Sequence, residues 1–237
     1  MTRPAPPSYA GYRFPAEIIS FAVWLYFRFP LSLRHVDEIL AARGIAVSHE
    51  TVRQWGLKFG QGFANQIRCR LPRAGDKWHL DEVAVKIGGV KHWLWRAVEQ
   101  DGFVLDVLVQ HRRDKVDAER LLRKLLKKQM RPSRVMITDK LASYAAAKKD
   151  LLPGVEHRQH KGLDNRAENS HQPTRRRERQ MKRIKSSGQG QRFLSAHAGI
   201  NNLFHLRRDH LRAEQYRMAW SRAFHAWSEI TGVAAVE

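Results

Sequence analysis

Residues 77–109 carry the pattern that most constrains how this chain can fold. Within the first part, 77–87, alternate positions read His, Asp, Val, Val and Ile, which is the period of a β-strand. Gly88 and Gly89 then supply the positive φ angles that a two-residue hairpin turn requires. Two further runs of β-branched and aromatic residues follow, separated by a second turn at 100–102. The pattern therefore predicts a three-stranded antiparallel meander.

An acidic residue, Asp81, lies among the β-branched residues of the first predicted strand. A carboxylate at such a place is expensive to bury unless a cation meets it. Taken by itself, Asp81 is read most simply as an ion-paired residue or as a residue at a strand end. Further acids along the chain are needed before it indicates a catalytic site.

The balance of charge limits the class of partner. Lys and Arg number 43 against 23 Asp and Glu, which gives a net charge of +20 at pH 7 and a pI of about 10.8. Basicity on this scale points to a polyanion, with nucleic acid first and an acidic membrane surface second. The length of 237 residues allows one or two domains with a proper core.

Cysteine content and hydropathy indicate the compartment. Cys69 is the single cysteine, so no intrachain disulfide can form and a reducing compartment is expected. The most apolar run, 18–27, is too short to span a bilayer, and no cationic leader precedes it. With nucleic acid as the favoured partner, we expect a cytoplasmic, nucleoid-associated protein with no membrane partner.

The N-terminal part of the chain predicts a flexible tail followed by a small helical domain. Residues 1–12 contain three prolines and read as the tail. Residues 13–60 hold three predicted helices, and the second and third of them can be capped by Ser32 and Ser48. Gly44 is a plausible stop for the second helix.

A helix, a short glycine-containing connection and a capped helix form the helix-turn-helix pattern. In that pattern the last helix enters the major groove of DNA with its N-terminal residues on base edges. A plain three-helix bundle has the same periodicity, and the net charge favours DNA binding. The candidate base readers are His49, Thr51, Arg53 and Gln54.

After a linker expected over 61–76, the meander continues into an α/β pattern. Residues 115–129 form a predicted helix, and a short buried strand follows at 135–138. A strand joined through a helix to another strand of the same sheet is the right-handed crossover of an α/β fold. Asp139 directly follows this fourth strand, where polar functional groups of α/β sheets collect. Residues 155–158 read as a fifth, short strand.

A third acid, Glu168, lies early in a helix predicted to begin near Asp164. Pro173 is expected to kink that helix or to mark its restart. Arg175 is seven residues after Glu168 (175 − 168), which places it two turns away on the same helix face.

The motifs around these three acids are similar to those of a known family. Asp81 lies in W-H-L-D-E, Asp139 in I-T-D-K and Glu168 in D-N-R-A-E-N-S-H-Q-P-T-R-R-R. Together they resemble the DDE transposases of bacterial insertion sequences, and most closely the insertion-sequence-six family. Two departures stand out. The interval from Asp139 to Glu168 is 29 positions (168 − 139), shorter than in the best-known members, and Arg175 stands where many DDE enzymes carry Lys.

The resemblance covers nearly the whole chain and implies its fold and organisation. It implies an α/β fold with an RNase H-like catalytic core, a mixed five-stranded sheet with helices, over residues 77–208. An all-α helix-turn-helix domain precedes this core. A C-terminal helix over 209–237 follows it.

The resemblance also implies the chemistry. Asp81 would bridge two Mg²⁺ or Mn²⁺ ions, Asp139 would hold one of them and Glu168 the other. The residue types agree, because hard divalent ions take oxygen ligands and three converging carboxylates repel one another without a cation. Two such ions can activate the nucleophile and stabilise the leaving oxygen of a phosphodiester. Glu82 has the opposite parity in its strand, which makes it the weaker candidate.

A basic segment follows the third acid. Residues 157–192 hold 11 Lys and Arg against 3 acids, a local charge of +8 (11 − 3). Such a run is often only a solvated helix face, but beside the predicted site it favours binding to the DNA backbone. Arg175 would contact a phosphate near the scissile bond by resemblance. The candidate DNA-binding residues of this segment are Arg175, Arg176, Arg177, Lys182 and Arg183.

These features predict an enzyme that binds the terminal inverted repeats of an insertion sequence, cleaves the DNA ends and transfers the 3′ ends to target DNA. Two other functions remain open: a DNA-binding regulator with an inactive RNase H-like domain, and a nuclease without strand transfer. A homodimer or higher oligomer on DNA is expected, because transposition holds two element ends together. For the aromatic stripes at 193–204 and 216–227, core packing is the default interpretation and a subunit contact is the second.

Overall fold

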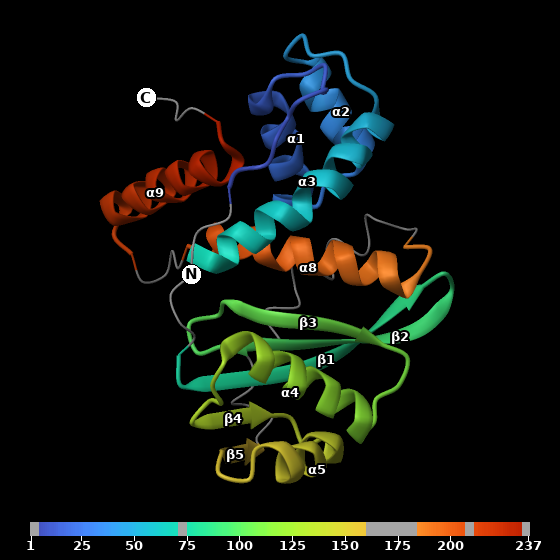
Figure 1. Ribbon diagram of the computed structural model, residues 1–237, viewed down its shortest axis with the longest axis vertical. Helices are drawn as coiled ribbons and strands as arrows, with labels where there is room; N and C mark the ends of the chain where they lie inside the picture. The colour runs from blue at the N-terminus through green and yellow to red at the C-terminus, as the bar shows by residue number, and fades with distance from the viewer. Residues whose placement is uncertain (1–4, 71–74, 160–183, 207–210, 234–237) are drawn as a thin grey trace. The chain divides into compact units, whose positions relative to one another are not determined.

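The computed structural model describes residues 5–70, 75–159, 184–206 and 211–233 (Figure 1). The chain forms two compact units. The sheet unit comprises Pro72–Ser195, and the helical unit comprises Met1–Leu71 together with Ala196–Glu237.

The sheet unit is built on a mixed five-stranded sheet with the strand order β3-β2-β1-β4-β5. Its strands are β1 (Lys77–Ile87), β2 (Val90–Glu99), β3 (Val104–Gln110), β4 (Val135–Thr138) and β5 (Glu156–Gln159). The first three are antiparallel neighbours, and β4 and β5 run parallel to β1. Gly88 and Gly89 take positive φ angles of 58° and 83° in the first hairpin. The predicted meander and the mixed sheet are thus confirmed.

The crossover helix α4 (Lys115–Gln129) packs on one face of this sheet (Figure 1). Asp114 begins the helix by accepting a hydrogen bond from the Asp117 N–H at 3.0 Å. The leucines of α4 share a buried core with α5 (Ala142–Leu151) and with the side chains that β1 and β2 direct to the same face. That core includes Trp78, Leu80, Trp95, Leu121, Leu125 and Tyr144. The burial of these large apolar side chains is what holds β4 beside β1.

The first residues of α8 (Ser187–Leu203) also belong to the sheet unit. The Gln191 side chain accepts a hydrogen bond from the Val109 N–H at 2.8 Å and donates one to the Val107 carbonyl at 3.0 Å. This amide therefore satisfies backbone groups of β3, the edge strand that would otherwise expose them.

The helical unit contains the three helices predicted near the N-terminus: α1 (Ala16–Arg28), α2 (Leu33–Ala41) and α3 (His49–Arg70). Ser32 caps α2 through the His35 N–H at 3.1 Å, and Ser48 caps α3 through the Thr51 N–H at 3.2 Å. Gly44 lies between them with a φ of 74°. Apart from the extent of the third helix, the local patterns predicted this region correctly.

The linker predicted over 61–76 is wrong for residues 61–70, because α3 continues to Arg70. Phe63 and Ile67 are buried along this extension. The glycines of the segment misled the prediction, because glycine usually weakens a helix. At Gly60 the missing side chain instead makes room for the ring of Phe27 on α1.

The predicted boundary at residue 208 is also corrected, because residues from Ala196 onward group with the N-terminal helices. Asn201 of α8 donates a hydrogen bond to the Phe27 carbonyl at 3.0 Å. In α9 (Ala213–Thr231), Trp227 packs edge-on against Phe63 of α3 at 5.2 Å between ring centroids. The C-terminal helices thus complete the core of the helical unit rather than that of the sheet unit. The aromatic stripes were therefore correctly expected to pack in a core.

The flexible tail predicted over 1–12 is likewise corrected for residues 5–12. The Tyr9 ring stacks on Phe59 at 5.0 Å, and its hydroxyl donates to the Thr231 carbonyl at 2.8 Å. The Ala5 carbonyl accepts a hydrogen bond from Gln66 at 2.9 Å. No helix among the residues that the structure describes is long and apolar enough to cross a membrane.

Two glycines of α3 test the packing of the helical unit. A Cβ built on Gly60 would lie 2.5 Å from Cε2 of Phe27, whereas one built on Gly62 meets nothing within 4 Å. Gly62→Ala should raise the free energy of unfolding by about 0.5–1 kcal/mol through helix propensity. Gly60→Ala should lower it by about 1–2 kcal/mol, because overpacking the buried ring outweighs the same propensity gain. Urea unfolding of both variants measures the difference, and stabilisation by Gly60→Ala would contradict the packing described.

Candidate active site

The sheet brings two of the three predicted acids to the same edge. Residues Lys77–Leu80 of β1 pair in parallel with Val135–Thr138 of β4. Asp81 and Asp139 are each the next residue after the last pair, Asp81 within β1 and Asp139 directly after the end of β4. Here β4 ends while β1 continues to Ile87. We call this point, where β4 ends beside the continuing β1, the fork. The sheet extends from it to β2 and β3 on one side and to β5 on the other, and α/β sheets place their ligand sites at such points.

Asp81 lies across the sheet from an arginine. The register places it directly opposite Arg96 of β2, on the same face, and Arg96 is only 2% exposed. Burial lowers the pKa of Arg96 to about 10, and the negative charge of Asp81 opposes this shift. The half-buried carboxylate thus has the cationic neighbour that its position in the strand requires.

Asp139 is held by its surroundings at both carboxylate oxygens. Its Oδ1 accepts a hydrogen bond from the Leu141 N–H at 2.9 Å, and its Oδ2 lies 3.4 Å from Nη2 of Arg113. Its backbone carbonyl accepts a hydrogen bond from the Thr138 hydroxyl at 2.7 Å. These contacts orient a carboxylate that remains about one-third exposed, at 32%.

Glu82 and Arg113 join this site, and the sequence analysis did not identify Arg113. The Glu82 side chain is fully buried on the face covered by α4, and its Oε1 accepts a hydrogen bond from Arg113 Nε at 2.6 Å. Burial raises the pKa of Glu82 to about 7. The charge of Asp139 adds to this rise, and the contacts with Tyr144 and Arg113 oppose it. The opposite parity of Glu82 was a correct signal that it faces away from Asp81.

The other predicted site residues in the C-terminal half lie outside the described residues. They are Glu168, Arg175, Arg176, Arg177, Lys182 and Arg183. Within the described part of the chain, no group of three or more His, Cys, Asp and Glu side chains could hold a metal ion. The two acids at the fork offer only oxygen donors, which suits a hard cation such as Mg²⁺ or Mn²⁺.

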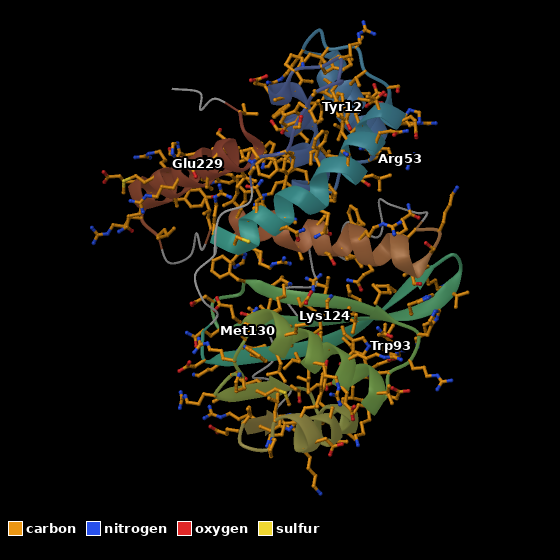
Figure 2. The ribbon with its side chains drawn as sticks, viewed as in Figure 1. Tyr12, Arg53, Trp93, Lys124, Met130 and Glu229 are labelled. Carbon is orange, nitrogen blue, oxygen red and sulfur yellow. The ribbon has the colours of Figure 1, made fainter. Side chains whose placement is uncertain are left out.

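The candidate base readers lie in the first turns of α3, on the surface of the helical unit. Arg53, labelled in Figure 2, donates two hydrogen bonds to Glu50 at 2.8 and 2.6 Å, and Gln54 donates a third at 3.2 Å. His49 is exposed and Thr51 is partly exposed. An open groove of about 710 Å³ lies beside these turns. Its lining includes Tyr12, Arg13, Phe14, Thr51, Gln54 and Lys58.

The Glu82–Arg113 pair should matter for stability more than a surface pair of similar length. Arg113→Met leaves the buried carboxylate without its cationic partner, which should lower the free energy of unfolding by about 2 kcal/mol. The control is Lys115→Met, which breaks the exposed 2.6 Å pair with Asp150 and should cost much less. Chemical unfolding at pH 8 measures both, and equal losses would mean that Glu82 does not depend on Arg113.

Comparison with known proteins gives a consistent result. Residues 75–207 match the protein family described as DDE domain. The transposase for insertion sequence element IS257 in transposon Tn4003 of Staphylococcus aureus is 31% identical over 164 residues, which cover 67% of this chain and 73% of that protein. The transposase for insertion sequence-like element IS431mec of the same species has the same identity and coverage.

Two solved structures are also similar to parts of the chain. The HTLV-2 integrase catalytic core domain in complex with magnesium has a TM-score of 0.34 and 17% identity, covering 42% of this chain and 66% of that one. The simian T-cell lymphotropic virus intasome in complex with PP2A regulatory subunit B56 gamma has a TM-score of 0.43 and 16% identity. That match covers 61% of this chain and 53% of the other.

The family match spans the whole described sheet unit, and the relatives cover two-thirds of the chain. The mixed sheet with its crossover helix is the RNase H-like fold that the motifs implied. The chain belongs to the DDE transposases of bacterial insertion sequences, within the insertion-sequence-six family.

Proposed function

We propose that this transposase binds the terminal inverted repeats of its insertion sequence, cleaves the DNA ends and transfers the 3′ ends to target DNA by two-metal phosphoryl transfer. The observation that carries the proposal is the fork between β1 and β4, where Asp81 lies in β1 and Asp139 directly follows the neighbouring parallel strand β4. Two carboxylates at such an edge repel each other unless a cation joins them.

In this proposal the residues of the fork bind and orient. Asp81, Asp139 and Glu168 are the acids that would hold the divalent ions, Mg²⁺ or Mn²⁺. When bound, the ions supply charge stabilisation at the attacking and leaving oxygens of the phosphodiester. The Leu141 N–H keeps Asp139 in one orientation, which limits the rearrangement needed for coordination. Arg96 limits the repulsion at Asp81 before coordination.

DNA recognition is divided between two regions. The first turns of α3 read base edges, and Arg53 and Gln54 exchange their hydrogen bonds with Glu50 for bonds to bases. The basic segment after Glu168 binds phosphates, which supplies affinity without sequence preference. Two copies of the chain hold the two element ends, and the protein acts at the nucleoid, where its DNA substrates are.

The chemistry is tested by Asp139→Asn, which keeps the size of the side chain and removes its charge. Strand transfer should fall by at least about a hundredfold, because a metal ligand is lost. Binding to terminal-repeat DNA should remain at the wild-type level. The assay is strand transfer in Mg²⁺ by purified protein on DNA carrying the repeats that flank its gene.

Asp150→Asn is the matched control for this variant. Asp150 lies in α5 of the same unit and is exposed, and the change removes the same charge. Its strand transfer should equal that of the wild type. Near wild-type transfer by Asp139→Asn would remove Asp139 from the set of metal ligands.

The division of DNA contacts is tested by salt titrations with a repeat duplex and a scrambled duplex. Arg53→Ala should reduce discrimination between the two duplexes by about tenfold. Arg177→Ala should weaken binding to both duplexes alike and flatten the salt dependence, because a phosphate contact carries no sequence information.

The control here is Arg34→Ala, an exposed arginine on α2 whose loss should leave discrimination unchanged. If Arg53→Ala lowers the affinity for both duplexes equally, the start of α3 does not read the DNA sequence and has only a structural role. A loss confined to the repeat duplex for Arg177→Ala would move recognition into the C-terminal half of the chain.

A further inference from the structure

Arg113 lies in the loop between β3 and α4, and its guanidinium is held on three sides. Its Nε donates to Glu82 Oε1 at 2.6 Å, and its Nη2 pairs with the same carboxylate. The guanidinium carbon lies 4.9 Å from the ring centroid of Trp93, which is labelled in Figure 2. On the third side, Nη2 is 3.4 Å from Oδ2 of Asp139. An arginine so fixed is preorganised rather than mobile.

The pairing with Glu82 offsets the positive charge that Arg113 brings close to Asp139. A positive charge beside Asp139 would weaken the binding of a divalent ion there, because like charges repel. The fully buried carboxylate of Glu82 neutralises that charge at short range. The burial of Glu82 would in turn be costly without a cationic partner. The two side chains therefore form a neutral pair at the edge of the candidate metal site.

The contacts of Arg113 differ in strength. Nε and Nη2 both engage Glu82 closely, whereas the 3.4 Å distance from Nη2 to Asp139 exceeds the roughly 2.7–2.9 Å of a strong charge-assisted hydrogen bond. Glu82 is therefore the anchor, and the contact with Asp139 is the one that can be exchanged. The Arg113 side chain is 36% exposed, so part of it faces solvent beside Asp139.

We propose that Arg113 binds a phosphate of the DNA strand in the active site, with Glu82 and Trp93 holding it in place. This inference rests on the proposed function. Nη2 of Arg113, whose 3.4 Å contact with Asp139 is the weaker one, turns that hydrogen bond to a phosphate oxygen. Guanidinium groups suit this task because their planar donors match phosphate oxygens. Arg113 thereby adds a substrate contact to the two acids of the described site.

The test pairs Arg113→Gln with single methylphosphonates, which remove the charge of one DNA phosphate at a time. The full-length protein is titrated in Ca²⁺ with a duplex of the flanking repeat, carrying the modification at each phosphate around the cut. In the wild type, one position should weaken binding about tenfold. Arg113→Gln should bind unmodified DNA about tenfold more weakly than the wild type does. A methylphosphonate at that position should then lower the affinity of the variant by less than about a further twofold.

Arg112→Gln is the matched control, since it removes the same charge from the preceding position of the same loop. Its effect should add fully to that of every methylphosphonate. Arg113→Lys keeps the charge and loses the planar fork, so it should show a partial loss at the same phosphate. It also carries the test if Arg113→Gln does not fold.

The proposal is overturned if, for both Arg113 variants, the affinity lost through the substitution adds fully to the affinity lost through the methylphosphonate at every phosphate. Failure of the proposed function is seen separately, as wild-type protein that does not cleave or join unmodified repeat DNA in Mg²⁺. An active wild type with full additivity thus rejects the role of Arg113 alone.

Discussion

The site depends on one short stretch of parallel pairing, in which Lys77–Leu80 of β1 lie beside Val135–Thr138 of β4. These four pairs set the register that makes Asp81 and Asp139 neighbours, although they are 58 positions apart (139 − 81). The crossover helix α4 and its buried leucines hold the two strands together. A slip of one residue would turn one acid to the opposite face, because the side-chain period of a strand is two.

Charge compensation is the second constraint on the fork. Each of the two acids has an arginine beside it: Arg96 across the strand from Asp81, and Arg113 next to Asp139. Arg96 is buried in the sheet, whereas Arg113 is anchored by Glu82 and remains partly exposed. The two arginines offset the repulsion between the two carboxylates in the absence of a cation. This compensation also explains why an acid of the opposite strand face belongs to the same electrostatic unit.

The amino-acid sequence predicted most of the features that depend on residues close together in the chain. The double-glycine hairpin at Gly88, the caps at Ser48 and Asp114, and the strand end at Asp139 all involve neighbours in the chain. The misses have a common cause, because each depends on a contact between distant residues. Gly60 looks like a helix breaker until Phe27 packs on it, and Arg113 joins a residue 31 positions away with no local motif. Similarly, only packing on Phe59 shows that the proline-rich tail is fixed at Tyr9.

We propose that Asp81 and Asp139 bind a divalent cation at the fork between β1 and β4. The most direct measurement is Mn²⁺ binding to the full-length protein, followed by electron paramagnetic resonance of the free ion. The wild type should bind Mn²⁺ in a saturable way, and Asp81→Asn should weaken that binding by at least about tenfold. Equal affinity in the two proteins would contradict the account, because it would place the cation away from the fork.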